Sequence, residues 1–600
     1  MLQKGKIVSL FVALSFAAGC GKAAKNHTVT IAENGLAKAV IVIAEDAAEP
    51  EQHAAAELAD FLRQITGGKF EIEKAPAAGQ SRLLVGAGAA KLAVADFSIE
   101  GLGADGIVMR TAGSDLILAG GQPRGTLYAV YTFLQDELGC RWWSSTESTI
   151  PKRPNLEVDR LNVRYVPVLE YREPYWFDAF DGDWAVRNRC NGHRPRLDAK
   201  RGGKHTYEGF VHTFYPLIPP QKYFKGHPEW FSQIKGKRTY ERAQLCLTNE
   251  QMRAELVKNL KERLRNNPAA TIASVSQNDW RGNCQCAKCA AIEKEEGSPA
   301  GLMLRFVNSV AEEIEDEFPN VAVSTLAYQY TRKPPKITRP RHNAIVRLCS
   351  IECSFSKPLG DERNQEFRDD IVGWSKICDR LYIWDYTTNF RHHVMPHPNL
   401  RVLGPNVKFF VDHNVKGIFE QGAYGTYGAE MAELRAWVLA RLLWEPTLDG
   451  QQLIDEFIAG YYGPAGPHIE DYLKVTHDAV EASGDHLGCF SQHTAKFLSF
   501  ETLSKGWEHL KAAEAAAKND PDFLFRVRVA QLPVMYAFMM RWDPMRQACE
   551  AAGADWPMPD SIQEAFDNFM TVARKKKITR LSEWKEGFGA LEQAVERAKK

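Results

Sequence analysis

Strand-like and helix-like segments alternate through the middle of this 600-residue chain, which predicts an α/β fold whose main part is a (β/α)8 TIM barrel. Several strand-like segments end on polar or acidic residues, and a helix-like segment follows most of them. The carboxyl ends of parallel barrel strands meet at one mouth, so these end residues would face one another. The segments are TIASVSQND (ending at Asp279), VAVSTLAYQY (Tyr330), IVRLCSIE (Glu352), RLYIWDY (Asp385, Tyr386) and VKGIFEQ (Glu420, Gln421).

The N-terminus predicts export. Lys4 and Lys6 precede the apolar run IVSLFVALSFAAG, and small residues precede Cys20, as in bacterial lipoproteins whose cysteine becomes acylated. We therefore expect residues 1–20 to be a lipoprotein-type signal peptide, with plain cleavage as the alternative. The mature chain would be anchored by lipid in the periplasm or at the outer cell surface of a bacterium, and would touch the membrane only through that anchor.

A small α/β domain is expected over residues 28–158. Strand signals occur at TVTIA, AVIVIA, RLLVGAG, GIVMRTAG and DLILAGG. The segments AAAELADFLRQITGG and RGTLYAVYTFLQDELGC have the spacing of amphipathic helices. The sequence thus predicts an independent layered unit before the barrel.

The barrel is expected over residues 160–445, with roughly 30–50 residues for each strand–helix unit. From residue 446 to 600 the strand signals stop and the segments have helical spacing, which predicts a helical C-terminal domain. The expected barrel strands are EYREPYW (170–176), one near HTFYPLIPP (212–220), QLCLTN (244–249), and five that end near Asp279, Tyr330, Glu352, Asp385 and Glu420.

Four acids at strand ends indicate glycosidic bond cleavage, which requires a carboxylic acid and a second group near the anomeric carbon. The candidates are Asp279, Glu352, Asp385 and Glu420. Each has a structural alternative: an ion pair with Lys or Arg for Glu352, loop stabilisation for Glu420, helix capping for Asp385 and an Asx turn for Asp279.

Carbohydrate is the expected partner, because aromatic and polar residues accompany these acids. The formal net charge is zero, which excludes a general attraction to nucleic acid. The residues expected to contact substrate are Trp384, Tyr386, Tyr328, Asn278, His392 and Gln421.

The sequence CQCAKC holds Cys284, Cys286 and Cys289. Three thiolates bind zinc only if a fourth ligand comes from elsewhere, and no second Cys or His pair at matching spacing is evident. A disulfide and free thiols are the alternatives, and no metal or cofactor is assigned.

Ordered motifs along the chain resemble a known bacterial group. HPEWFSQIKGKR with QLCLTN, SVSQND with CQCAKC, RLCSIECSFSKPL, IWDYTTNF and GIFEQG occur in the order found in proteins classified under a domain of unknown function. That group includes the endo-β-N-acetylglucosaminidases of glycoside hydrolase family 163, which act on complex N-glycans. GTLYAVYTFLQDELGCRWW resembles the N-terminal domain of α-glucuronidases and β-N-acetylhexosaminidases, and the whole resemblance covers about residues 28–470.

The resemblance implies a retaining, substrate-assisted endo-β-N-acetylglucosaminidase on glycoprotein glycans. Glu352 and Glu420 are then the first candidates for the chemistry, with Asp385 and Tyr386 holding the acetamide or a hydroxyl. An exo-acting α-glucuronidase-like hydrolase is one alternative, and it predicts Arg or Lys at the mouth because its substrate carries a carboxylate. A non-catalytic surface glycan-binding lipoprotein is the other.

Overall fold

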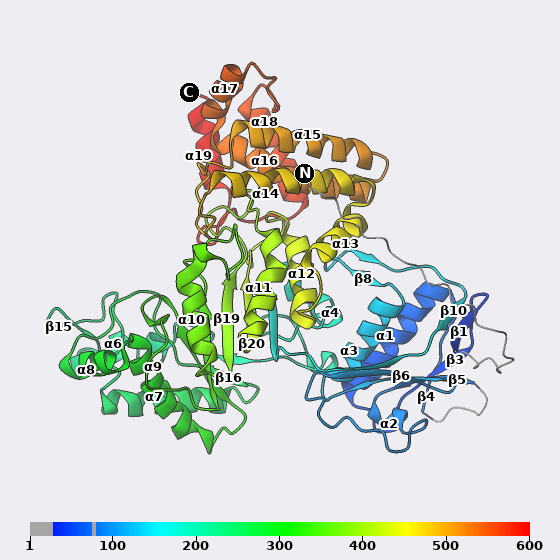
Figure 1. Ribbon diagram of the computed structural model, residues 1–600, viewed down its shortest axis with the longest axis horizontal. Helices are drawn as coiled ribbons and strands as arrows, with labels where there is room; N and C mark the ends of the chain where they lie inside the picture. Colours follow the sequence, from blue (N-terminus) through cyan, green and yellow to red (C-terminus); the bar gives the residue numbers. More distant parts are fainter. Residues whose placement is uncertain (1–27, 75–79) are drawn as a thin grey trace, which may run out of the picture.

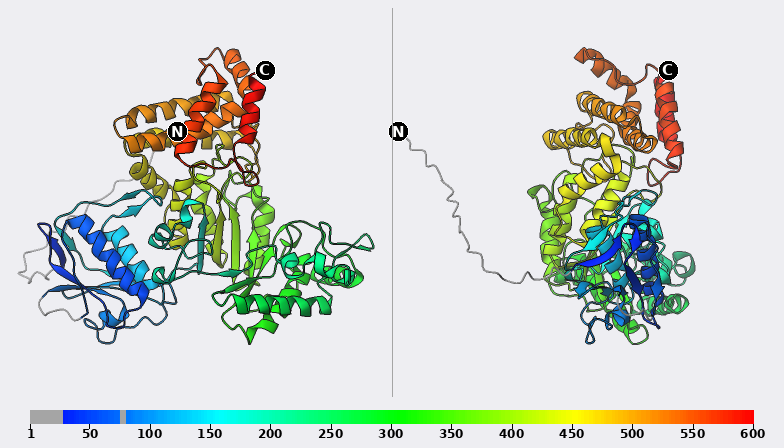
Figure 2. Two further views of the ribbon diagram at one scale, coloured as in Figure 1. Left: turned by 180° about the vertical axis from the view of Figure 1, so that it is seen from behind. Right: turned by 90° about the vertical axis from the view of Figure 1, so that its right-hand side faces the viewer.

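A computed structural model describes residues 28–74 and 80–600 (Figure 1). The predicted signal peptide and Cys20 lie outside the described residues. An N-terminal α/β unit and the part that contains α7–α9 lie on opposite sides of a central sheet, and the C-terminal helices lie above it (Figure 2). The predicted combination of an α/β unit, a parallel sheet and a helical C-terminal region is therefore confirmed.

The N-terminal unit is a six-stranded mixed sheet with the order β11-β6-β7-β5-β3-β4. Its two faces follow from strand alternation, since Ile41 and Leu83 pack against α1 and α3 while Val40 and Leu84 pack around α2. The elements are β3 (Ala39–Val42), β4 (Ile72–Glu73), β5 (Ser81–Val85), β6 (Ile107–Ala112), β7 (Asp115–Gly120), β11 (Asn162–Tyr165), α1 (Glu49–Thr66), α2 (Ala87–Ala90) and α3 (Gly125–Thr132).

The central sheet has seven parallel strands in the order β12-β20-β19-β18-β17-β16-β13. Long connections, most of which contain α-helices, join successive strands and allow every ladder to be parallel. The connection between β17 and β18 contains only the short 3-10 helix Gln329–Thr331. The strands are β12 (Tyr171–Tyr175), β13 (Tyr207–Glu208), β16 (Ile272–Ser274), β17 (Ala322–Ala327), β18 (Ala344–Cys349), β19 (Leu381–Tyr386) and β20 (Val415–Gln421).

This sheet curls until its two edges approach each other. Each strand contributes one side chain to a single inner cluster, and the rings of Tyr171 on β12 and Tyr207 on β13 lie 6.1 Å apart. Among the described strands, however, β12 and β13 share no ladder. A closed eight-stranded barrel is therefore not confirmed; the sheet is a seven-stranded partial barrel that is open between β12 and β13.

One of the expected barrel strands, QLCLTN, is absent from this sheet, and the strand expected near HTFYPLIPP lies just before that segment. Residues 212–220 contain α5 (Phe214–Leu217), and the strand of that unit, β13, lies before them. The prolines of HTFYPLIPP lack the N–H groups that a ladder requires. Residues 244–249 form only an isolated bridge, between Leu245 and Phe231, because this segment instead binds the loop after β16.

Helices cover the outer face of the curled sheet. Every residue of α12 (Ala432–Trp444) is buried, because this helix lies between β12, neighbouring helices and the N-terminal unit. The other surrounding helices are α4 (Gly182–Arg187), α7 (Glu250–Asn266), α8 (Ala287–Glu296), α9 (Pro299–Glu315), α10 (Gln365–Ser375) and α11 (Leu400–Asp412).

The C-terminal region is helical, as predicted. Helix α16 is long and apolar enough to span a membrane by composition, but it packs against α13, α15 and α18 and most of it is buried. It is therefore the central helix of this region. The helices are α13 (Gly450–Tyr462), α14 (Gly466–Ser483), α15 (Phe500–Ala517), α16 (Pro521–Met540), α17 (Trp542–Ala552), α18 (Ile562–Lys575) and α19 (Gly589–Ala598).

A buried group of charges joins the N-terminal unit to the central sheet. Asp105 accepts from Arg124 at 2.5 Å and from Arg172 of β12 at 3.0 Å, and all three side chains are at most 9% exposed. Although burial alone would raise the pKa of Asp105, the two guanidinium groups lower it to about 2. The ionised carboxylate therefore holds two parts of the molecule together.

Replacing Asp105 by Asn leaves Arg124 and Arg172 buried without their shared counter-charge, so we expect the free energy of unfolding to fall by about 3 kcal/mol at pH 7. The native pKa lies below the unfolded value, so the stabilisation should disappear as the pH falls from about 4 to about 2. Urea unfolding at several pH values measures both effects. Asp96→Asn, at an exposed position of the same unit, is the control. A loss of stability that does not depend on pH would contradict the role of the carboxylate.

Candidate active site

A cavity of about 360 Å³ opens at the carboxyl ends of the central strands. Its volume lies in the range of small-ligand sites, and aromatic side chains form most of its wall. The aromatic lining residues are Tyr175, Phe210, Tyr328, Trp384, Tyr386, Phe390, Phe419, Tyr424, Phe490 and Trp584. The polar lining residues include His212, Asp279, Gln421 and Glu583.

Asp279 is one of the two carboxylates of this cavity. Its side chain is 60% exposed, and its Oδ1 accepts a hydrogen bond of 3.0 Å from the Tyr328 hydroxyl. The preceding residue fixes the loop, since the Asn278 backbone N–H donates to the Gln244 side chain at 2.9 Å and its amide group donates to the Ala243 carbonyl at 3.0 Å. The loop after β16 therefore presents Asp279 to the cavity from a rigid base.

Glu583 is the other carboxylate, and it comes from the segment between α18 and α19. Its Oε1 accepts from the Gln421 amide at 3.0 Å and from the Tyr424 hydroxyl at 3.1 Å. Its backbone N–H donates to the carbonyl of Phe390, in the loop after β19, at 2.8 Å. Both side-chain bonds end on Oε1, which leaves Oε2 for a ligand.

The environments of the two carboxyl groups differ. Burial raises the pKa of Glu583, and the charge of Asp279 raises it further, although the bonds from Tyr424 and Gln421 oppose this. Asp279 is mostly exposed. Two carboxyl groups in contrasting environments are the arrangement that separates an acid from a charged partner in acid–base catalysis.

Aromatic rings extend from the floor of the cavity to its rim. Trp384 lies on the floor, where its ring contacts Phe419 at 4.6 Å and its Nε1 donates to Gln421 at 2.7 Å. At the rim, Trp584 is 59% exposed and stacks on Phe490 at 5.6 Å. Exposed aromatic pairs beside a cavity mark a binding surface, and flat rings suit the apolar face of a sugar.

The cavity wall contains no lysine or arginine among its lining residues. Arg347 lies beneath the floor, where its guanidinium is 4.7 Å from the ring of Phe210 and 5.2 Å from that of Trp384. Arg347 is fully buried within the curled sheet. The cavity is therefore built for a ligand without a strong negative charge.

Several predicted residues reach the cavity and others do not. Asp279, Tyr328, Trp384, Tyr386 and Gln421 line it. Asn278 is buried beneath the Asp279 loop. His392 is also buried, with its Nδ1 2.7 Å from the Tyr536 hydroxyl of α16, so the loop after β19 packs under the C-terminal helices at this point.

Asp385 and Glu420 point away from the cavity. They are direct neighbours across the β19–β20 ladder, and strand alternation places them opposite the inward Trp384 and Tyr386. Ser350 donates to Asp385 on this outer face. Burial raises the pKa of Asp385 to about 6, and burial together with Asp385 raises that of Glu420 well above its usual range.

Glu352 lies in the turn after β18, where it is 43% exposed and forms an ion pair of 3.1 Å with Arg332. Arg332 also binds Glu366 and Asp370, at 2.9 and 2.6 Å. This is the ion-pair alternative that the sequence left open. The four predicted acids therefore do not face one another, and only Asp279 reaches the cavity.

Sequence reasoning missed Glu583, Tyr424 and Trp584. Glu583 and Trp584 lie in RLSEWKEG, a break between two helices more than three hundred residues beyond Asp279. The signal available in the sequence was an acid next to a tryptophan, although the segment that begins at Trp584 was predicted to be helical. Tyr424 lies in the glycine-rich turn after β20, three residues after the predicted substrate-binding residue Gln421.

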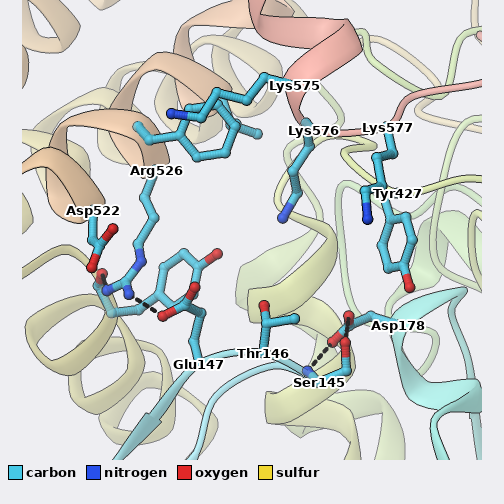
Figure 3. A pocket seen from close by; sticks show the side chains of 13 residues that line it. Ser145, Thr146, Glu147, Asp178, Tyr427, Asp522, Arg526, Lys575, Lys576 and Lys577 are labelled. Atoms are coloured by element: carbon cyan, nitrogen blue, oxygen red, sulfur yellow. Dashed lines mark hydrogen bonds and ion pairs between the residues drawn. The ribbon is translucent and has the colours of Figure 1, made fainter.

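A second cavity, of about 210 Å³, lies between the N-terminal unit and the C-terminal helices (Figure 3). Figure 3 shows Arg526 joined to Glu147 and Ser145 joined to Asp178. Lys576, which also lines it, is paired with Glu433 at 2.6 Å. Among the described residues no ion pair is present for its other lining charges, Asp522, Lys575 and Lys577. Only three of its thirteen lining residues are aromatic, so the larger, mostly aromatic cavity is the stronger candidate for catalysis.

The cysteines of CQCAKC lie outside the main cavity. Cys284, Cys286 and Cys289 converge with Cys246 behind the loop that carries Asp279. The fourth sulfur comes from the segment that was expected to be a barrel strand.

The fold is similar to that of a solved glycoside hydrolase. The chain is similar to a 4-O-methyl-α-glucuronidase of family GH115 with specificity for decorated arabinogalactans, at 12% identity and a TM-score of 0.59, over 93% of this chain and 79% of that one. Weaker similarities are to a GH138 enzyme targeting pectin rhamnogalacturonan II (11% identity, TM-score 0.46, 91% and 94% covered) and to CpGH84B (10% identity, TM-score 0.44, 95% and 97% covered). No curated protein matches the chain.

Two family models match the sequence. Residues 25–133 match the glycosyl hydrolase family 67 N-terminus, which accounts for the N-terminal α/β unit. Residues 142–474, more than half of the chain, match the model described as domain of unknown function DUF4838. The chain therefore belongs to the DUF4838 family.

Proposed function

We propose that this protein is a glycoside hydrolase in which Glu583 is the acid/base residue and Asp279 is the second carboxylate. The observation that carries the proposal is the presence of both groups in one aromatic cavity, with the pKa of Glu583 raised by burial and by Asp279. A raised pKa favours a proton on Glu583 that can be given to the leaving oxygen. The fold and the N-terminal domain match are consistent with this activity.

The proposed substrate is a β-linked N-acetylhexosamine within a glycoprotein glycan, cleaved by an endo-acting, retaining mechanism. The aromatic wall of the cavity, which carries two carboxyl groups but no lysine or arginine among its lining residues, supports an uncharged sugar. The acetamide oxygen attacks its own anomeric carbon while Glu583 protonates the leaving oxygen. Asp279, positioned by Tyr328, orients the acetamide N–H, and water then opens the cyclic intermediate with Glu583 as the base.

An exo-acting α-glucuronidase-like hydrolase is the second candidate, and the fold shared with the GH115 enzyme favours it. Its substrate carries a carboxylate, however, and the cavity offers no lysine or arginine among its lining residues to bind one. A glycan-binding protein without turnover is the third candidate, and such a protein does not require two carboxyl groups in one cavity.

Glu583→Gln and Asp279→Asn should each lower turnover by about 100-fold or more, because each removes one carboxylate of the pair. The assay is incubation with a complex N-glycoprotein and mass spectrometry of the released glycans. Glu352→Gln, which changes a carboxylate of the surface ion-pair network, is the matched control and should retain most of the activity. Loss of glycan release in Glu352→Gln, together with full release in Glu583→Gln, would show that Glu352 is catalytic and Glu583 is not. Release only from uronic acid polysaccharides would favour the second candidate.

The pH dependence of activity should reflect the raised pKa of Glu583. Activity requires its protonated form, so activity should decline as the pH rises through the raised pKa. The Tyr424 hydroxyl lowers this pKa, so Tyr424→Phe should move the alkaline limb of kcat/KM to higher pH. Tyr427→Phe, a matched change beside the second cavity, should leave the limb in place. If the alkaline limb of Tyr424→Phe coincided with that of the wild-type protein, Glu583 would not be the group whose deprotonation limits activity.

We also propose that the protein is exported and anchored through lipid on Cys20, on the basis of the N-terminal sequence pattern. In a bacterial host, labelled palmitate should be incorporated into the full chain and should be absent from Cys20→Ala. Cys378→Ser is the control, because this buried cysteine lies far along the chain. Equal labelling of all three proteins would contradict the anchor.

A further inference from the structure

Four cysteine sulfurs converge at one point behind the Asp279 loop. The Sγ atoms of Cys246, Cys284, Cys286 and Cys289 all lie within 4.8 Å of one another. Cys246 is 3.8 Å from Cys286 and 3.8 Å from Cys289. A tetrahedral zinc with Zn–S bonds of about 2.3 Å separates its sulfurs by about 3.8 Å. A disulfide would require about 2.05 Å.

Two chain segments bring these sulfurs together. Cys286 is the N-cap residue of α8 and Cys289 lies in its first turn, whereas Cys246 precedes α7 on a segment that pairs with Phe231. A Cys-x₂-Cys pair at a helix start, completed by cysteines from loops, is a common form of structural zinc site. The cluster is buried beside Leu302, which limits access of water to the sulfurs.

Hydrogen-bond donors surround the sulfurs. The backbone N–H of Gln233 donates to Cys284 Sγ at 3.2 Å, and Arg238 Nη1 donates to the same atom at 3.5 Å. The Thr248 hydroxyl lies 3.3 Å from Cys289 Sγ. Such donors stabilise thiolates, and a nearby guanidinium offsets the net negative charge of four thiolates on one divalent ion.

We propose that Cys246, Cys284, Cys286 and Cys289 bind one zinc ion as a closed structural site. Four protein ligands leave no open position, so the ion has no place for substrate or water. The zinc would tie the segment before α7 to the start of α8. Gln244, two residues from Cys246, already donates to the carbonyls of Asn278 and Trp280, on either side of Asp279. Zinc would therefore stabilise the loop that presents Asp279.

Metal analysis of the full chain tests this proposal directly. Protein expressed without added metal should contain about one zinc per chain by inductively coupled plasma mass spectrometry. The Cys246→Ser/Cys289→Ser double variant should contain less than about one-tenth of that amount. Cys378→Ser, which removes a buried thiol elsewhere, should retain the wild-type content. Replacing zinc by cobalt should produce the intense near-ultraviolet charge-transfer bands of a tetrathiolate site.

The wild-type measurement does not depend on whether the double variant folds. Protein without zinc, in which peptide mapping under non-reducing conditions finds disulfides among the four cysteines, would overturn the proposal, as would four thiols that titrate freely in metal-free native protein. Iron in place of zinc would overturn the identity of the ion. Zinc that is lost to a strong chelator together with a lower Tm would support a structural role.

Discussion

Side-chain alternation along the parallel strands determines which residues of the central sheet face the cavity. Successive residues of a strand face opposite sides, so a shift of one position decides between the cavity and the packed outer face. Trp384, Tyr386 and Gln421 face inward, and their neighbours Asp385 and Glu420 face outward. The same alternation places Arg347 beneath the floor of the cavity and Ser350 against the outer carboxyl pair.

Most of the strand–helix order could be predicted from the sequence. The strands β17 to β20 have six or seven residues each and are largely apolar, and α-helices follow β18, β19 and β20, so local patterns define them well. The region between β12 and β16 could not be predicted in this way. Its strand β13 has only two residues, and QLCLTN has strand-like composition but serves instead to hold the Asp279 loop and to supply a sulfur to the cysteine cluster.

The candidate site was only partly predictable, for a physical reason. Asp279 and the aromatic residues follow strands, and convergence of strand ends was expected for them. Nothing local indicates that Asp385 and Glu420 would turn outward, because both candidates sit in apolar runs with no polar alternation. Glu583 reaches the cavity because the segment before α19 packs against the loop after β19, although the two are far apart in the sequence. Local patterns in one sequence do not indicate contacts between residues so far apart.

Glu583 lies outside the part of the chain that matches the family model. The stretch that defines the family ends at residue 474, whereas Glu583 belongs to the helical region beyond it. Asp279 and most of the aromatic wall therefore lie within the matched stretch, whereas Glu583, Phe490 and Trp584 lie beyond it. If Glu583 is the acid/base residue proposed above, a relative that lacks this helical region also lacks that carboxyl group, so shared family membership alone does not imply a shared reaction.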